Sequence, residues 1–385
     1  MKVALIHDFL KEYGGAERVL EAMHEIWPQA PVFTSFYLPN KMPDSFKSWD
    51  IRVSKIQKIP VISKISKIFT FFYPFVFESM DVREYDVVIS STASFAKGVI
   101  TKPNQLHICY CHTVPRFLYG YPSETSRRKI WFLKPVLAVL DFFLRVWDHS
   151  AAQRVDEFVV NSDEVGKRVA KFYRKAATII YPPVDVNRFQ LSTNSRQPAV
   201  SSERSADSYY LIVSRLSAYK NIDLAILACQ KLGEKLKIVG TGREEERLKK
   251  LAVSNQPSAV SKIDFLGMIS DEELVEYYQN CKAVIFAGED DFGIVPVEAA
   301  ACGKPVIALA VGGALETIIQ HTTGEFFTKP TVESLVGVLE HFEPGKYRPE
   351  NCRKQAEKFS KEKFIADFAN FVEKKWKEKE NARIA

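Results

Sequence analysis

The sequence predicts an α/β protein in which helices cover parallel β-sheets that are divided between two domains. Short apolar runs alternate with amphipathic helical segments along most of the chain. The 385 residues also exceed the usual length of one hydrophobic core, and a polar stretch interrupts the alternation near the middle. We expect an N-terminal domain over 1–189, a flexible insert over 190–208, a C-terminal domain over 209–350 and a C-terminal helical segment over 351–385.

The composition is that of an ordinary folded protein. Hydrophobic residues make up 46% and charged residues 26% of the chain, and the formal net charge is +6. This mildly basic balance suits an anionic ligand or membrane surface but is too weak to indicate nucleic acid, so we expect no nucleic-acid partner. The six cysteines lack the paired spacing of a zinc site and predict reduced thiols.

No segment predicts export or a membrane span. The apolar run Met1–Ile6 ends at His7, which makes it too short for a signal peptide. The stretch that comes nearest to a spanning helix, 131–147, is interrupted by three charged residues. We therefore expect a cytoplasmic protein, either free or held peripherally on the inner face of the cell membrane.

Mostly apolar runs of strand length recur through the first half. They lie at Val3–Ile6, Pro31–Phe36, Asp86–Ser90, Leu106–Tyr110, Glu157–Asn161 and Thr178–Tyr181. Ser162 is suited to cap the helix that follows the fifth run. A glycine pair, Gly14 and Gly15, follows the first run and opens an amphipathic helix. Glycines there let the backbone approach a diphosphate or a sugar, although close packing alone would explain them equally well.

His112 and Arg116 follow the run Leu106–Tyr110. Open α/β sheets bind ligands beyond the carboxyl ends of their strands, so His112 is placed where chemistry can occur. A structural histidine is the alternative. Arg116 adds a cation that can meet a carboxylate or phosphate.

The segment Lys55–Phe77 interleaves lysines with isoleucines and ends in a cluster of aromatic residues. Lysines and aromatic side chains on one amphipathic segment are what a contact with an anionic membrane surface requires. A core helix with a solvated lysine face is the alternative, and the sequence supports both equally.

Five mostly apolar runs of strand length lie in the second half. They lie at Tyr209–Val213, Leu236–Val239, Ile263–Leu266, Ala283–Ala287 and Pro305–Leu309, and most end in glycine or charged residues. One edge of this sheet is therefore predicted to be polar and glycine-rich. Arg215 and Lys220 fall in the loop after the first run and suit a diphosphate, although solvated surface charges are the alternative.

The stretch 289–308 is the most informative in the chain. The strand Ala283–Ala287 leads into a turn crowded with carboxylates, and a helix that carries Glu298 follows. Pro296 suits the first turn of this helix. Phe292, Gly293 and Ile294 would then lie at a helix N-terminus, where free amides favour a phosphate or polar ligand.

Taken together, these motifs resemble family 4 of the retaining, nucleotide-sugar-dependent glycosyltransferases, and bacterial mannosyltransferase-like members in particular. The similarity covers nearly the whole chain except 190–208. It rests on Gly14–Glu17, Tyr110–Phe117, Asn161–Ser162, Tyr181–Asp185, Ser214–Asn221, Val239–Gly242, Phe265–Gly267 and Glu289–Ile307. The resemblance implies a GT-B architecture, with two Rossmann-like domains facing across a cleft, the acceptor in the first and the nucleotide sugar in the second. The last helix would cross back to the N-terminal domain.

The resemblance also implies roles for individual residues. Arg215 and Lys220 would neutralise the diphosphate in place of a metal, so neither a metal nor another cofactor is expected. Glu298 would hold the ribose, and His112 would lie beside the transferred sugar. The remaining donor contacts would come from Gly14, Gly15, Gly240, Gly242, Gly267, Met268, Ile269, Glu289, Phe292, Gly293 and Ile294, and Arg116 would lie on the acceptor side.

One departure from the family pattern concerns the first of two spaced glutamates. That position is Asp290 here, which keeps the carboxylate but shortens it by one methylene. Glu289 could substitute by a shift of one residue, so both remain candidates for the contact with the donor sugar.

The implied reaction moves a hexose, expected to be mannose from GDP-mannose, onto a lipid-linked or polysaccharide acceptor in cell-surface glycan synthesis. The donor's own phosphate would take the proton of the acceptor hydroxyl, and the protein would position the substrates and stabilise charge. Two alternatives remain open, a sugar-nucleotide epimerase of the same fold and a non-catalytic module that binds membrane or glycan.

Overall fold

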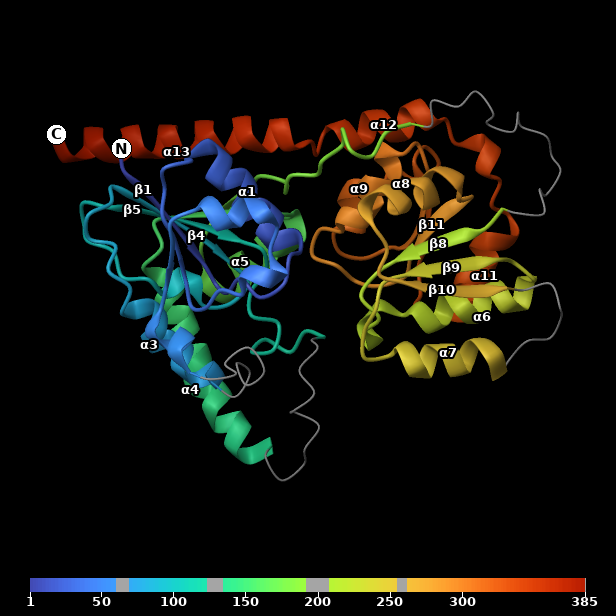
Figure 1. Cartoon of the computed structure of the whole chain (residues 1–385), viewed down its shortest axis with the longest axis horizontal. Coiled ribbons are helices and arrows are strands. Elements are labelled where there is room, and N and C mark those ends of the chain that lie inside the picture. Colours follow the sequence, from blue (N-terminus) through green and yellow to red (C-terminus); the bar gives the residue numbers. More distant parts are fainter. Residues whose placement is uncertain (60–68, 123–133, 192–207, 255–261, 385) are drawn as a thin grey trace. The chain divides into compact units, whose positions relative to one another are not determined.

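The computed structural model describes residues 1–59, 69–122, 134–191, 208–254 and 262–384. The chain forms two compact units, Met1–Pro183 with Glu362–Ala385 and Val184–Lys361. Each unit contains one sheet, of seven strands in the first and six in the second, and all pairs among the described strands are parallel. The predicted α/β class with two helix-covered parallel sheets is therefore confirmed (Figure 1).

The limits of the units differ from the domain limits expected at 189 and 350. Val186 and Phe189 are buried, and the guanidinium of Arg353 donates to both of their carbonyls at 2.6 Å. This segment therefore packs within the second unit, as does helix α12 (Pro349–Glu357), which lies against α9 (Ile294–Ala301). The chain joins the first unit only from Glu362 onward. Most of the expected insert, 192–207, lies outside the described residues.

The first sheet has the order β3-β2-β1-β4-β5-β6-β7. Its strands are β1 (Val3–His7), β2 (Val32–Thr34), β3 (Ile51–Val53), β4 (Val87–Thr92), β5 (Leu106–Cys111), β6 (Glu157–Val160) and β7 (Ala177–Ile179). The central strands β1, β4 and β5 are buried along their whole length, as expected for strands that helices cover on both faces of the sheet.

Helices cover both faces of this sheet. On one face, α1 (Gly15–Ile26) and α13 (Lys361–Ile384) pack over alternate residues of the strands, and Phe364 and Phe368 of α13 contact the ring of Tyr110. The other face is covered by α3 (Tyr73–Glu78), α4 (Lys134–Gln153) and α5 (Asp163–Tyr173). The predicted cap of α5 is confirmed, since the Ser162 hydroxyl accepts from the amide of Val165.

The second sheet has the order β10-β9-β8-β11-β12-β13. Its strands are β8 (Tyr210–Val213), β9 (Leu236–Val239), β10 (Ile263–Gly267), β11 (Ala283–Phe286), β12 (Val306–Leu309) and β13 (Gly324–Phe327). On one face, α6 (Ile222–Leu232), α7 (Glu245–Ser254) and α11 (Val332–Glu340) close the core. Helices α8 (Asp271–Asn280), α9 and α12 lie on the other face (Figure 1), with the short α10 (Ala314–Thr317) after β12.

Part of the segment Lys55–Phe77 is buried and part of it is exposed. Ile56, Tyr73 and Phe77 are buried in the core of the first unit, whereas Phe72 and Phe75 are more than half exposed. Residues 60–68 lie outside the described part of the chain. Across the described residues, no helix has the length and apolar character needed to cross a bilayer.

Candidate functional site

The candidate site of the second unit lies where the carboxyl ends of β8 and β11 meet. These strands are neighbours in the sheet but are separated in sequence, because the chain runs from β8 outward to β10 before it returns to β11. Ligands of open α/β sheets bind at such a reversal of strand order. The loops that leave β8, β9, β11 and β12 supply Lys220, Gly240, Asp290 and Gly313 to this edge.

Glycines bring the loops of this edge together. Gly240 adopts a φ of +120°, and a Cβ atom there would lie 2.0 Å from the Ser214 carbonyl oxygen. A Cβ at Gly242 would lie 2.3 Å from the oxygen of Leu216, whose amide donates to Thr241 at 2.9 Å. Gly240 and Gly242 therefore have a packing reason to be glycine, and their donor contacts stay a prediction.

A second close approach fixes the acidic loop after β11. A Cβ atom at Gly313 would lie 2.1 Å from the oxygen of Phe292, and the Gly313 amide donates to the Asp290 carbonyl at 3.0 Å. Gly313, in the turn after β12, therefore supports this loop from a neighbouring strand end. The loop ends at Gly293, which precedes α9 with a φ of +85°, and the predicted helix start beside Pro296 is confirmed.

The structure pairs Lys220 with Asp290. The Lys220 Nζ lies 2.5 Å from Oδ1 and 2.6 Å from Oδ2 of this carboxylate, and the two side chains are only 11% and 25% exposed. Asn221, with a φ of 51°, donates from its side chain to the Ala287 carbonyl at 3.1 Å and so ties the lysine loop to the end of β11. A partly buried cation is thus held at the sheet edge by the Asp290 carboxylate, and an anionic ligand could replace this carboxylate beside the cation.

Glu298 is held by a tyrosine that sequence reasoning missed. Its side chain is 4% exposed, and its Oε2 accepts from the Tyr278 hydroxyl of α8 at 2.9 Å. Burial, with Glu298 as the second cause, raises the pKa of Tyr278 well above its usual range. Tyr278 therefore stays protonated as a donor and fixes the orientation of the Glu298 carboxylate.

The other predicted residues of the second unit lie around this edge with varied exposure. Arg215 is exposed, and its guanidinium donates to the Tyr219 hydroxyl at 3.3 Å. Gly267 accepts from the Gly240 amide at 2.8 Å, and the next residue, Met268, is 78% exposed. Half-buried side chains are those of Ile269, Glu289 and Ile294, whereas Phe292 and Gly293 are buried.

In the first unit, a chain of polar side chains leads to His112. His112 Nε2 lies 2.8 Å from the Ser91 hydroxyl, and that hydroxyl lies 3.2 Å from His7 Nδ1. His7 Nε2 in turn lies 3.4 Å from Glu17, whose second carboxylate oxygen accepts from the Gly14 amide at 2.9 Å. This series connects the ends of β1, β4 and β5 to the start of α1, where Gly15 is the first helical residue. It holds the His112 ring in one orientation.

Asp8 fixes the loop after β4 beside this series. Its buried carboxylate accepts from the Thr92 hydroxyl and from four successive backbone amides, at 2.7–2.9 Å. Because the Asp8 carboxylate already accepts these hydrogen bonds, it stabilises the loop and has few acceptor positions left for a ligand. Arg116 is half-buried, and its guanidinium lies 3.5 Å from the Pro122 carbonyl.

The free energy of unfolding is expected to rise with pH between about pH 3 and 6.5 because of His112. Burial, with His7 as the second cause, lowers the pKa of His112 to about 3 from an ordinary value of 6.5. In this window the unfolded chain binds a proton that the folded chain does not, so this contribution is complete above pH 6.5 and is lost as the pH falls. The slope reaches at most about 1.36 kcal/mol for each pH unit.

Urea unfolding of the wild type and His112→Gln over this pH range checks the expectation, since glutamine can keep the bond to Ser91. The stability difference in favour of the wild type should grow with pH and become constant above about pH 6.5. The exposed His341, changed to glutamine, serves as the control. Parallel pH profiles for wild type and His112→Gln would contradict the assignment.

The two sheets and their loops define a GT-B protein, and solved structures support this class. The chain resembles sucrose-phosphate synthase from Thermosynechococcus elongatus at a TM-score of 0.73 and 18% identity, covering 97% of this chain and 99% of that one. It also resembles Anabaena HepE in complex with UDP-glucose at a TM-score of 0.68 and 19% identity, covering 97% and 100%. At such identities, the likeness shows the fold alone.

Family models match both halves of the chain. Residues 13–188 match "Glycosyltransferase Family 4" and residues 194–359 match "Glycosyl transferases group 1". The chain belongs to this glycosyltransferase family, with a family 4 domain followed by a group 1 domain, as the sequence motifs predicted.

Curated relatives share lower identity over part of the chain. The alpha-1,3/1,6-mannosyltransferase ALG2 of Kluyveromyces lactis is 26% identical over 279 residues, which are 62% of this chain and 53% of that protein. An uncharacterized glycosyltransferase of Methanocaldococcus jannaschii is 29% identical over 160 residues, which are 40% and 45%. The chain thus spans about half the length of these relatives.

Proposed function

We propose that the protein is a retaining hexosyltransferase that moves mannose from GDP-mannose onto a lipid-linked or polysaccharide acceptor in bacterial cell-surface glycan synthesis. The observation that carries this proposal is the Lys220–Asp290 pair at the reversal of strand order in the second sheet. A lysine on this edge suits the diphosphate of a nucleotide sugar. The mannosyltransferase relatives support the choice of sugar, and the nucleotide complexes of Anabaena HepE support the class of donor.

Lys220 would act on the leaving group. When the bond between the anomeric carbon and the diphosphate oxygen breaks, negative charge gathers on that diphosphate, and the Lys220 ammonium would neutralise it. The donor's phosphate oxygen would take the proton of the attacking acceptor hydroxyl on the face that the nucleotide leaves. The protein would need no base of its own, and Arg215 would add a second cation from the same loop.

The carboxylates would orient the donor. Glu298, fixed by Tyr278, would accept from the ribose hydroxyls, and Asp290 would turn from Lys220 to a sugar hydroxyl when phosphate takes its place beside the ammonium. Glu289 remains the alternative for that sugar contact. In the first unit, the series that ends at His112 would present an uncharged imidazole to the sugar, because the pKa of His112 is about 3.

A donor screen followed by product analysis tests the proposal. Thermal unfolding is measured with GDP-mannose, UDP-glucose and an ADP sugar, and the true donor at about 100 times its Kd adds about 2.7 kcal/mol of stability. Transfer of labelled sugar to a lipid extract, with NMR of the anomeric carbon, then establishes acceptor class and retention. Activity should persist in EDTA, because the cations of the β8 loop would replace a metal.

The alternatives give different results in the same assays. Conversion of one donor sugar into another without any acceptor would identify an epimerase. Stabilisation by a UDP or ADP sugar but not by GDP-mannose would overturn the choice of donor and leave the reaction class intact. Failure of all nucleotide sugars to stabilise the protein would overturn the proposal and favour a non-catalytic module.

A further inference from the structure

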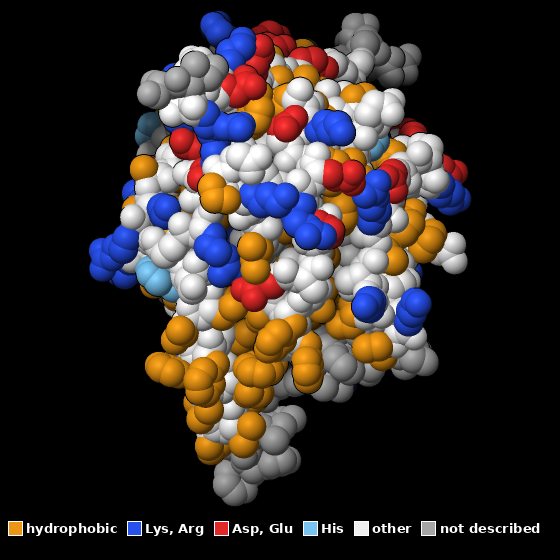
Figure 2. Space-filling view, turned by 90° about the vertical axis from the view of Figure 1, so that its left-hand side faces the viewer, with side chains coloured by type: hydrophobic (Ala, Val, Ile, Leu, Met, Phe, Trp, Pro, Cys, Tyr) orange, Lys and Arg blue, Asp and Glu red, His pale blue; other side chains and the backbone are white. Residues whose placement is uncertain are grey.

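The first unit exposes an apolar face built from α4, α3 and Phe72, the residue before α3. Seven large side chains contribute, each 53–65% exposed, namely Phe72, Phe75, Val136, Val139, Phe142, Phe143 and Val146. Figure 2 shows hydrophobic side chains gathered together in the lower part of the view. Single exposed apolar residues are ordinary on protein surfaces, whereas a gathered set of this kind marks an interaction site. We refer to these residues as the α3–α4 apolar face.

Helix α4 presents apolar side chains on two sides. Leu144 faces inward and is 3% exposed in the core of the unit. Val136, Val139, Phe143 and Val146 recur at spacings of three and four residues and form a stripe on the outward side. A surface helix normally carries polar residues on its outward side, so this stripe is not explained by packing within the unit.

Ion pairs and hydrogen bonds keep the two helices together and remove their carboxylates from this face. Glu78 of α3 accepts from the Trp147 indole at 2.8 Å and from the Arg154 guanidinium at 2.8 Å. On α4, Asp148 is 1% exposed and Asp141 is half-buried. The apolar face is thus held in shape and carries little exposed negative charge.

Exposed lysines lie beside the same core cluster. Lys55 and Lys58 belong to the short 3-10 helix η3 (Lys55–Lys58), which packs through Ile56 into the cluster that holds Phe77 and Leu144. Cations on the unit that carries the exposed phenylalanines complement an anionic lipid surface, and the chain as a whole has a net charge of +6.

We propose that the α3–α4 apolar face inserts into the surface of a lipid bilayer that contains anionic lipids. Valine and phenylalanine side chains have no hydrogen-bonding groups, and hydrocarbon requires none. Energetic hot spots of protein–protein interfaces are enriched in tryptophan, tyrosine and arginine, and none of the seven side chains of this face is of these types. The proposal goes beyond the proposed function, because it holds whichever nucleotide sugar is the donor.

Vesicle co-sedimentation of the full chain tests this proposal. We expect binding to vesicles of phosphatidylcholine with phosphatidylglycerol, weaker binding at high salt, and at least an about tenfold loss of partitioning for Phe142→Ser/Phe143→Ser. The double variant Val253→Ser/Ile319→Ser removes exposed apolar side chains from the second unit and should bind like the wild type. Thermal unfolding of each variant verifies that it is folded.

A second measurement places the face in the lipid. A tryptophan at position 143, introduced by Phe143→Trp, should be quenched by brominated lipids in vesicles. Absence of vesicle binding, or equal binding by wild type and Phe142→Ser/Phe143→Ser, would overturn the proposal. So would a dimer, seen by sedimentation velocity, that the same variant abolishes without any lipid binding. These outcomes do not affect transfer to a soluble acceptor, so the proposed function is tested independently of this proposal.

Discussion

Replacing Lys220 by alanine is expected to slow sugar transfer by about 10²- to 10³-fold, by analogy with the loss of one preorganised donor to a developing anion. The ammonium is partly buried, so water screens its charge less than at an open surface. Its removal also leaves the Asp290 carboxylate without the counter-ion that lies 2.5 Å away, which adds repulsion toward an incoming diphosphate. The measurement is single-turnover transfer at saturating donor, with thermal shift by the donor in parallel.

A matched control separates this effect from a general loss of an ion pair. Lys282 pairs with Glu234 at 2.5 Å, and these side chains are 14% and 17% exposed, close to the values of the Lys220 pair. Lys282 immediately precedes β11 and so lies at the opposite end of this strand from Asp290. Lys282→Ala should retain transfer. A rate for Lys220→Ala within threefold of the Lys282→Ala rate would remove Lys220 from the mechanism.

The same assay tests which carboxylate contacts the sugar. In Lys220→Ala/Asp290→Asn, the repulsion from Asp290 is removed, so donor binding should recover part of what Lys220→Ala loses. Transfer should remain slow, because the leaving diphosphate still lacks its cation. Comparison of Asp290→Asn with Glu289→Gln then shows which residue supports turnover, since both changes keep the side-chain length.

The sequence was most informative where a strand is buried on both faces. Runs such as Val3–Ile6 and Ala283–Phe286 are continuous and apolar, and the structure places buried strands there. The strands β3 and β13 were not predicted. Both lie at an edge of a sheet, and β3 has two exposed residues out of three, so neither produces the apolar run that identifies a central strand.

Site residues were predictable where the motif and the strand end coincide in sequence. Lys220 and Asp290 are 70 positions apart, yet each follows its own strand, and the order of the sheet brings them together. The residues that hold these site residues in place were not predictable in this way. Tyr278 reaches Glu298 from a different helix, and Ser91 reaches His112 from the next strand, so each contact depends on side-chain packing that no local pattern records.

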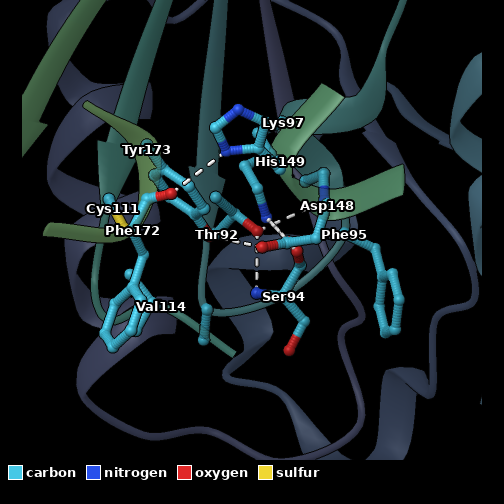
Figure 3. A network of polar contacts seen from close by, with 12 residues as sticks. Thr92, Ser94, Phe95, Lys97, Cys111, Val114, Asp148, His149, Phe172 and Tyr173 are labelled. Carbon is cyan, nitrogen blue, oxygen red and sulfur yellow. Dashed lines mark hydrogen bonds and ion pairs between the residues drawn. The ribbon is translucent and has the colours of Figure 1, made fainter. Parts of the chain in front are cut away.

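A buried ion pair that involves helix α4 leads to the largest expected effect on stability. Lys97 and Asp148 are each 1% exposed and lie 2.5 Å apart (Figure 3). The Tyr173 and Tyr119 hydroxyls donate to the same carboxylate at 2.8 Å. Burial lowers the pKa of Lys97, but Asp148 outweighs burial and the net shift is upward, so the lysine is charged at neutral pH. Asp148 belongs to α4, which connects this network to the helix that carries Phe142 and Phe143.

Lys97→Met is therefore expected to reduce the free energy of unfolding by about 3–5 kcal/mol, because it leaves a buried carboxylate without its cation. Urea unfolding at neutral pH measures the loss. The double variant Lys97→Met/Asp148→Leu should recover part of it, since removal of both charges eliminates the uncompensated one but also removes the acceptor of the Tyr119 and Tyr173 hydroxyls. Lys167→Met breaks the exposed pair with Asp163, at 70% and 54% exposure, and should cost less than about 1 kcal/mol.

The comparison between the single and double variants decides what holds α4 in place. If Lys97→Met unfolds as easily as the wild type, the pair contributes little and apolar packing alone anchors the helix. If Lys97→Met is destabilised and the double variant is restored, vesicle binding should be restored with it, because the outward stripe of α4 is unchanged. A double variant that is stable but does not bind vesicles would show that the ion pair itself, and not only the position of α4, determines the shape of the lipid-binding face.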